Sequence, residues 1–130
     1  MDLLMDEMLS LKKWAVVGAT SNPDKFGNKI YMKLKRQGYD VTPINPVYDE
    51  VDGDVCFNSL KDMPEIPECV SVVVSPKRAI VTVEEAIELG IKRLWFQPGT
   101  FDEEILDLAE NNGIEIVYYN CVLVEMDHRK

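Results

Sequence analysis

Residues 14–27 read WAVVGATSNPDKFG, an apolar run followed by a loop of small and polar residues. The four residues up to Val17 have the composition and length of a buried strand, and Gly18 closes the run. Small side chains after a strand let backbone N–H groups approach a phosphate, and the N-terminus of a helix expected from Phe26 adds positive potential. The stretch therefore predicts a strand, an anion-binding loop and a helix, in that order.

The loop favours a diphosphate site built from backbone amides, two hydroxyls and one ammonium group. Its candidate residues are Gly18, Ala19, Thr20, Ser21, Lys25 and Phe26. The sequence is not Gly-x-Gly-x-x-Gly, because Thr20 occupies the second glycine position, and it lacks the Gly-Lys-Ser/Thr of a Walker loop. The alternative is a tight turn that needs small residues for steric reasons alone.

The alternation of strands and helices continues outward from this unit. Residues 39–44, 70–74, 93–96 and 115–119 are β-rich runs. Helical patterns cover residues 26–37, 78–89 and 102–112, and a glycine directly follows each of them. Such alternation implies right-handed crossovers, so we expect an α/β fold: a Rossmann-like, doubly wound parallel sheet of five strands in a three-layer α/β/α arrangement.

Three segments lie outside this pattern. Residues 3–11 have the apolar spacing of a short amphipathic helix. Residues 47–57, around Asp52-Gly53, and a proline-rich stretch at Pro64 and Pro67 predict a hairpin-like excursion with one short helical turn between residues 45 and 67. We expect an N-terminal helix at 1–11, one domain at 12–126 and a charged tail at 127–130.

The composition is that of one ordinary globular domain, with 130 residues, 46% of them hydrophobic and 28% charged. No segment approaches the roughly 20 apolar residues of a membrane span, and residues 1–7 lack the basic start of a secretory signal. We therefore expect a cytoplasmic protein without a membrane partner. Three cysteines without CxxC spacing are interpreted as reduced thiols, and no metal site is expected.

Charge is distributed unevenly along the chain. The net charge of −9 argues against a nucleic-acid partner, which needs many basic residues to neutralise phosphates. Yet seven of the 14 basic residues lie between Lys12 and Arg36, where Asp24 is the one acid. This stretch is either a solvated helix face or a local field that attracts an anionic ligand.

Loops after the other strands add candidate residues, because ligands bind such sheets beyond the carboxyl ends of the strands. No acid follows the second strand, where NAD-binding enzymes place one against the ribose, so a nucleotide ligand other than NAD is favoured. Trp95 and Phe96 are interpreted as core residues. The further candidates are Asn45, Pro46, Ser75, Pro76, Gln97 and Gly99, with Lys77 and Arg78 as additional cations.

Catalytic groups are scarce. Cys121 lacks a base nearby in sequence, and we interpret it as a buried, inert thiol. His128, the single histidine, falls in the charged C-terminal residues. No carboxylate pair has a recognisable acid–base spacing, so we expect a binding protein rather than an enzyme.

The strand-end residues together resemble the stand-alone CoA-binding proteins of bacteria and archaea, relatives of the N-terminal domain of the succinyl-CoA synthetase alpha subunit. The resemblance extends from about residue 12 to residue 125. It rests on five motifs, which are residues 16–27, residues 38–46, Ser59-Leu60, residues 95–99 and Asn120-Cys121.

The resemblance implies a Rossmann-like domain that binds coenzyme A or an acyl-CoA. Residues 18–21 would contact the diphosphate, with Lys25 as a charged partner. Asn45-Pro46 would border the adenosine, and Ser75-Pro76 with Gln97 would border the pantetheine. The synthetase's phosphohistidine belongs to a separate domain, so ligase activity is not implied. No basic residue follows Asn45-Pro46 to hold the 3′-phosphate.

Two other functions remain open at this point. One is an NAD(P)-dependent oxidoreductase domain, which the fold class alone supports. The other is a regulatory subunit that presents CoA to a partner enzyme, with the helix at residues 3–11 or the excursion at 47–57 as a docking or homodimer surface.

Overall fold

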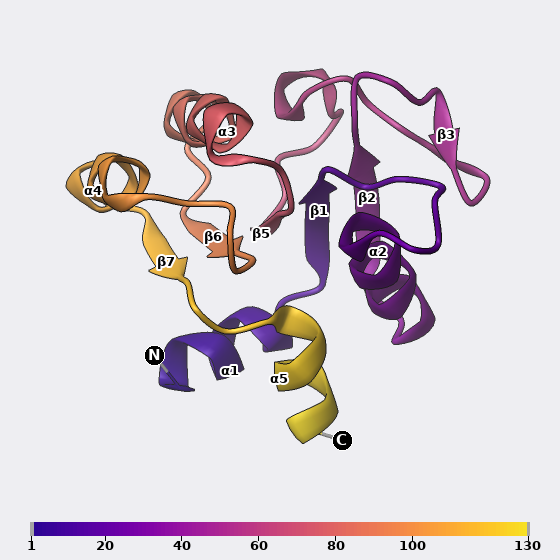
Figure 1. The fold of residues 1–130 in the computed structure, drawn as a ribbon, viewed down its shortest axis with the longest axis horizontal. Helices are drawn as coiled ribbons and strands as arrows, with labels where there is room; N and C mark the ends of the chain where they lie inside the picture. Colours follow the sequence, from indigo (N-terminus) through magenta and orange to yellow (C-terminus); the bar gives the residue numbers. More distant parts are fainter. Residues whose placement is uncertain (1, 130) are drawn as a thin grey trace.

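A five-stranded parallel sheet lies at the centre of the computed structural model, which describes residues 2–129 (Figure 1). The strand order is β2-β1-β5-β6-β7, and all four pairings are parallel. The strands are β1 (Lys13–Val17), β2 (Asp40–Ile44), β5 (Cys69–Val72), β6 (Arg93–Phe96) and β7 (Glu115–Val117). The predicted fold class is confirmed.

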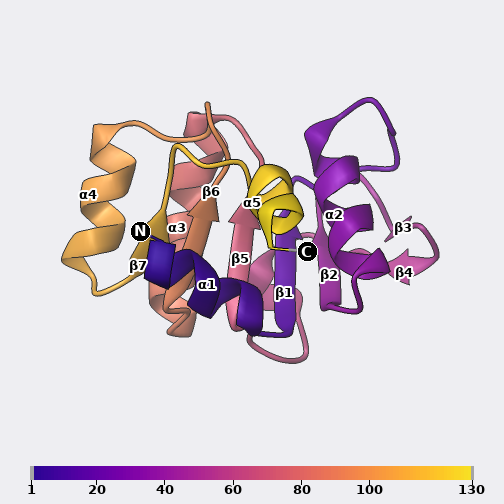
Figure 2. The same cartoon turned by 90° about the horizontal axis from the view of Figure 1, so that it is seen from below.

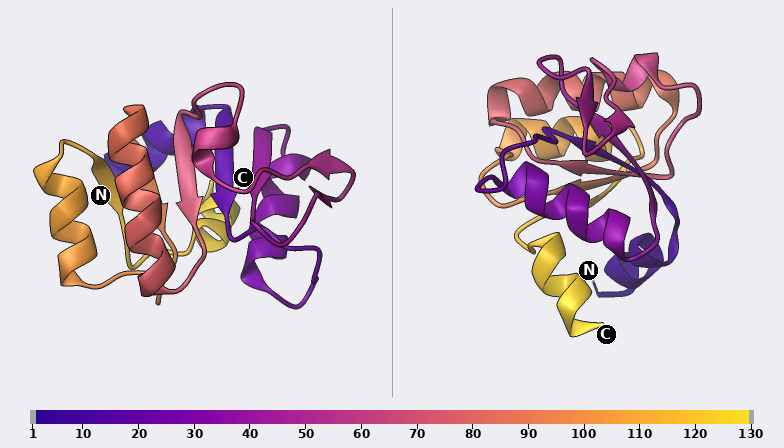
Figure 3. Two further views of the ribbon diagram at one scale, coloured as in Figure 1. Left: turned by 90° about the horizontal axis from the view of Figure 1, so that it is seen from above. Right: turned by 90° about the vertical axis from the view of Figure 1, so that its right-hand side faces the viewer.

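Helices cover both faces of the sheet and complete three layers (Figure 3, right). Helices α1 (Asp2–Ser10), α2 (Phe26–Arg36) and α5 (Val122–His128) lie on one face, and α3 (Pro76–Leu89) and α4 (Glu103–Asn111) lie on the other (Figures 1 and 2). A separate apolar cluster fills each interface. Within residues 2–129, none of these helices has the length and apolar content that a bilayer crossing requires.

Helix α5 was missed by the sequence analysis, which assigned residues 127–130 to a charged tail. Asp127 and His128 instead form the end of α5, and Lys130 lies outside the described residues. Val122 and Met126 are the buried residues of this short helix. Four of its seven residues are apolar, but a segment of two turns is too short to show a helical period, which explains the omission.

The expected excursion between β2 and β5 is a two-stranded hairpin beyond the β2 edge of the sheet (Figure 2). It pairs β3 (Glu50–Val51) with β4 (Asp54–Val55) in antiparallel register. The two turn residues, Asp52 and Gly53, have φ angles of 52° and 81°, as a type I′ turn requires. A short 3₁₀ turn, η1 (Leu60–Asp62), follows the hairpin as predicted.

Polar contacts fasten the hairpin to α2. The Tyr31 hydroxyl donates to the Asp54 carboxylate, and the Lys35 ammonium lies 2.8 Å from the same carboxylate. Burial disfavours the ionised carboxylate, but the hydrogen bonds from Lys35 and Tyr31 outweigh this effect and hold the pKa of Asp54 below its ordinary value of 3.8. The charged form of Asp54 therefore stabilises the fold.

We expect Asp54→Asn to lower the free energy of unfolding at pH 7 by about 1 kcal/mol, a small value for a charged hydrogen bond because the carboxylate is 41% exposed. A carboxyl whose pKa is depressed in the folded state stabilises above its unfolded pKa. The difference between variant and wild type should therefore shrink as the pH falls below about 4. Urea unfolding at pH 7, 5 and 3 measures this, with the exposed Asp107→Asn as control. A difference that grows on acidification would contradict it.

Candidate ligand-binding site

The direction of the chain across the sheet changes between β1 and β5. From β1 the chain passes through α2 to β2, toward one edge of the sheet. From β5 it passes through α3 to β6, toward the opposite edge. In open α/β sheets, ligands bind at such a point, in the crevice outside the carboxyl ends of the strands. Two cavities lie there, and Val74 lines both.

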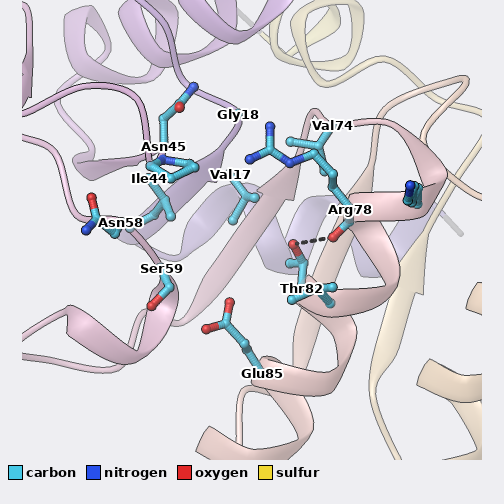
Figure 4. Close-up of a pocket in the computed structure, with 13 residues that line it drawn as sticks. Val17, Gly18, Ile44, Asn45, Asn58, Ser59, Val74, Arg78, Thr82 and Glu85 are labelled. Atoms are coloured by element: carbon cyan, nitrogen blue, oxygen red, sulfur yellow. Dashed lines mark hydrogen bonds between the residues drawn. The ribbon is translucent and has the colours of Figure 1, made fainter.

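The first cavity has a volume of about 370 Å³ and lies between the ends of β1 and β2 and the side of α3 (Figure 4). Its apolar lining consists of Val17, Ile44, Val74 and Val81. Its polar lining includes Asn45, Asn58, Ser59 and Thr82, and Pro46 borders it beside Asn45. An apolar slot with a few polar groups is the usual form of a small-molecule site.

The charges of this cavity all come from α3. Lys77 and Arg78 lie in its first turn, and Glu85 lies two turns further along the same helix. Neither cation has an ion-pair partner among residues 2–129. The positive end of the helix dipole adds to their field. The cavity therefore has a cationic end that suits a phosphate.

Gly18 makes the close packing at the end of β1 possible. Its φ angle is +99°, and a Cβ atom there would lie 2.3 Å from the Val73 carbonyl oxygen. Gly27 packs equally closely, because its Cβ would lie 2.0 Å from the Gly18 carbonyl oxygen. These contacts give the two glycines of the 14–27 stretch a steric role. The Gly18 N–H donates to the Ile44 carbonyl at 2.9 Å, so it has a protein partner already.

Hydrogen bonds hold the rest of this loop from several sides. The Asn45 amide donates to the Ala19 carbonyl at 2.9 Å, and the hydroxyls of Thr20 and Tyr48 lie 2.7 Å apart. Within residues 2–129, the backbone N–H groups of Ala19, Thr20 and Ser21 have no hydrogen-bond partner. Ala19 is fully buried, so the amides of Thr20 and Ser21 are the ones near the surface.

The structure brings together only part of the predicted loop site. Of its six residues, Gly18 lines the first cavity and Phe26 lines the second. Lys25 is exposed at the N-terminal cap of α2 and lines neither cavity. Asn45 and Pro46 line the first cavity.

The second cavity, of about 360 Å³, lies at the ends of β5 and β6 beside the start of α2. It contains four residues predicted from the sequence, Phe26, Ser75, Gln97 and Gly99. Pro76, the remaining candidate, is the first residue of α3 and lines neither cavity. Trp95 and Phe96 are fully buried, in agreement with their interpretation as core residues.

Two side-chain amides shape the cavities from within the protein. Gln97 is 4% exposed; it donates to the Cys121 sulfur at 3.2 Å and accepts from the Val122 N–H at 2.9 Å. Asn45 donates to Ala19 and accepts from the Val47 N–H at 2.9 Å. Because both ends of each amide are bonded within the protein, these residues position their loops, and each amide keeps one further N–H and one further lone pair.

Cys121 differs from its interpretation as a buried thiol. It is half-buried, occupies the N-cap position of α5 without a side-chain capping bond, and lines the second cavity. Cys56 and Cys69 are buried, and all three cysteines are free. Across the described residues, no group of three or more His, Cys, Asp or Glu side chains is arranged to hold a metal ion.

Sequence reasoning named Lys77 and Arg78 at the start of α3 but missed Val81, Thr82 and Glu85 further along the same helix. The residues at 78, 81, 82 and 85 follow the i, i+3, i+4, i+7 spacing of one helix face, and all of them line the first cavity. This spacing was visible in the sequence, but the same pattern also fits an ordinary solvated face. Asn58 has no such signal, because the fold of the excursion brings it to the cavity.

Known proteins match this chain over almost its whole length. The sequence profile of the family described as "CoA binding domain" matches residues 12–127. The alpha subunit of acetate–CoA ligase [ADP-forming] II from Pyrococcus furiosus is 29% identical to this chain. The alignment is 136 residues long and covers 96% of this chain. The chain spans only 30% of the length of that subunit.

Relatives of similar size to this chain also exist. Uncharacterized protein YneT from Bacillus subtilis is 27% identical, and the alignment covers 87% of this chain and 84% of that protein. The solved structure of a conserved hypothetical protein from Pyrococcus furiosus is 42% identical, with a TM-score of 0.84 over 88% of this chain and 98% of the other.

Proposed function

The chain belongs to the CoA-binding domain family, and we propose that it binds coenzyme A or an acyl-CoA across the two cavities at the carboxyl ends of the strands. Membership of the family supports CoA binding in general. The residues of the two cavities support a particular placement of the coenzyme on this chain.

The nucleotide part of the coenzyme is assigned to the first cavity. Lys77 and Arg78 are cations without ion-pair partners in the described chain, and they stand at one end of an apolar slot. Charged hydrogen bonds from such groups to phosphate are among the stronger polar contacts in proteins. This pairing of free cations with an apolar slot is the observation that carries the proposal.

Lys77 and Arg78 also provide the positive charge for the 3′-phosphate that the sequence did not show near Asn45-Pro46. No basic residue directly follows Asn45-Pro46, but the fold places the first turn of α3 at the same cavity. We assign the 3′-phosphate to Lys77 and Arg78. The amides of Thr20 and Ser21, which have no partner among residues 2–129, are then left for the diphosphate.

The pantetheine arm is assigned to the second cavity. Val74 lines both cavities, so an extended arm that leaves the nucleotide passes over the end of β5. Phe26, which is 57% exposed, and Gly99 border this path. Apolar rims of this kind suit the uncharged arm, and they place its thiol end toward Cys121.

A binding role without chemistry of its own fits these assignments. Cys121 is the thiol that lines the second cavity, and its sulfur accepts a hydrogen bond from the Gln97 amide rather than facing a base. A residue that activates a nucleophile has to lie within hydrogen-bond reach of it. We therefore propose that the protein holds or presents the coenzyme.

Isothermal titration of the full chain with CoA, dephospho-CoA and NAD tests the proposal. We expect one molecule of CoA to bind per chain, dephospho-CoA to bind more weakly because it lacks the 3′-phosphate, and NAD to bind weakest. Equal heats for the three compounds, or no heat for any of them, would overturn the proposal.

A further inference from the structure

We propose that Glu85 determines the base specificity of the site by accepting a hydrogen bond from the exocyclic amino group of an aminopurine. The proposal rests on the proposed function, because it takes the first cavity as the nucleotide site. Beyond that function, it assigns recognition of the base to one residue and sets the orientation of the nucleotide in the cavity.

The position of Glu85 on α3 sets this direction. Glu85 lies seven positions after Arg78, which places the two on one helix face about 10 Å apart along the axis. Both line the first cavity. In Figure 4 the Arg78 guanidinium extends toward the Gly18 side, whereas the Glu85 carboxylate points toward Ser59 at the other side. The cavity is therefore cationic at one end and anionic at the other.

The Glu85 carboxylate is free to meet a ligand. It makes no hydrogen bond or ion pair with any of residues 2–129. Lys61, whose charge interacts with Glu85 through space, is paired with Glu88 at 3.1 Å instead. An ionised carboxylate only accepts hydrogen bonds, so it repels a phosphate and favours a ligand group that donates.

The middle of the cavity suits a flat ring. Val17, Ile44 and Val74 form its walls, and Val81 adds an apolar side chain that is 53% exposed. A base lying against Val81 would remove that apolar surface from water. With the phosphates at the Arg78 end, the edge of the base then faces Glu85 and the Ser59 hydroxyl.

Adenine presents an amino group at this edge, and the amino group donates hydrogen bonds. Unsubstituted purine has the same ring but no donor at that position. A site built around a polar contact discriminates against an analogue that lacks the matching group, because the polar side chain of the protein is left unpaired. Glu85 would thus favour the aminopurine without any change in ring size.

A double-mutant cycle in ligand and protein tests the inference. The ligands are CoA and the CoA analogue with purine in place of adenine, and the proteins are the wild type and Glu85→Met, each checked by circular dichroism for the native fold. We expect the wild type to bind CoA about tenfold more tightly than the analogue, and Glu85→Met to bind the two equally. Glu85→Gln, which keeps an acceptor oxygen, should retain part of the preference.

Glu84→Met is the matched control, because Glu84 is exposed, belongs to the same helix and does not line the cavity. It should keep the tenfold preference. If the wild type binds CoA and the analogue equally, the role of Glu85 is refuted while CoA binding stands. If the wild type binds neither, the proposed function itself fails.

Discussion

Replacing Gly18 by alanine is expected to lower the free energy of unfolding by about 4 kcal/mol, a large part of the stability of a small domain. Two penalties add up at this position. A φ of +99° is unfavourable for any residue with a Cβ atom. The added Cβ would also lie 2.3 Å from the Val73 carbonyl oxygen, and backbone cannot move away as a flexible side chain can. Urea unfolding followed by circular dichroism measures the change.

Gly38→Ala separates the two penalties. Gly38 has a similar φ of +89°, but a Cβ atom there would meet nothing within 4 Å. We expect this variant to lose about 1 kcal/mol, the conformational part alone. Equal losses for the two variants would contradict the close packing of β1 against the end of β5.

Removing both cations of the first cavity is expected to weaken CoA binding about 100-fold, because each charged contact to a phosphate contributes on the order of 1.5 kcal/mol or more. The double variant Lys77→Ala/Arg78→Ala should also lose most of the preference for CoA over dephospho-CoA, since these side chains are assigned to the 3′-phosphate. Titration calorimetry with both ligands gives the two affinities, and the unfolding transition should stay near that of the wild type.

The matched control is Arg36→Ala/Lys92→Ala, which removes the same two charges from exposed residues outside both cavities. It should bind CoA within about threefold of the wild type, because distant surface charges are largely screened by salt. If the two double variants lose the same affinity, the effect is one of net charge. If neither loses affinity, the phosphates bind elsewhere.

The fold was largely predictable because its signals are local. Each of the five strands lies in a β-rich run, and a glycine follows each of the three predicted helices. The hairpin followed from Asp52-Gly53, whose positive φ angles that pair of residues adopts readily. Helix α5 was missed because Val122 and Met126 give it only two buried positions.

The site was predicted only in outline, because most of its contacts join distant parts of the chain. The sequence indicated the loops at the strand ends, and the cavities do lie there. The sequence did not show that the Asn45 amide hydrogen-bonds to Ala19. Nor did it show that the Gln97 amide hydrogen-bonds to Cys121 and Val122. The sequence also did not show that the 78–85 face of α3 lines the same cavity as Asn45. Such pairings depend on the folded arrangement of the elements.

A crystal structure of the chain grown with CoA tests the central claim most directly. We predict density for the nucleotide in the first cavity, with the 3′-phosphate within hydrogen-bond distance of Lys77 or Arg78, and density for the pantetheine passing Val74 into the second cavity. Coenzyme bound at another surface while both cavities contain only solvent would contradict the account.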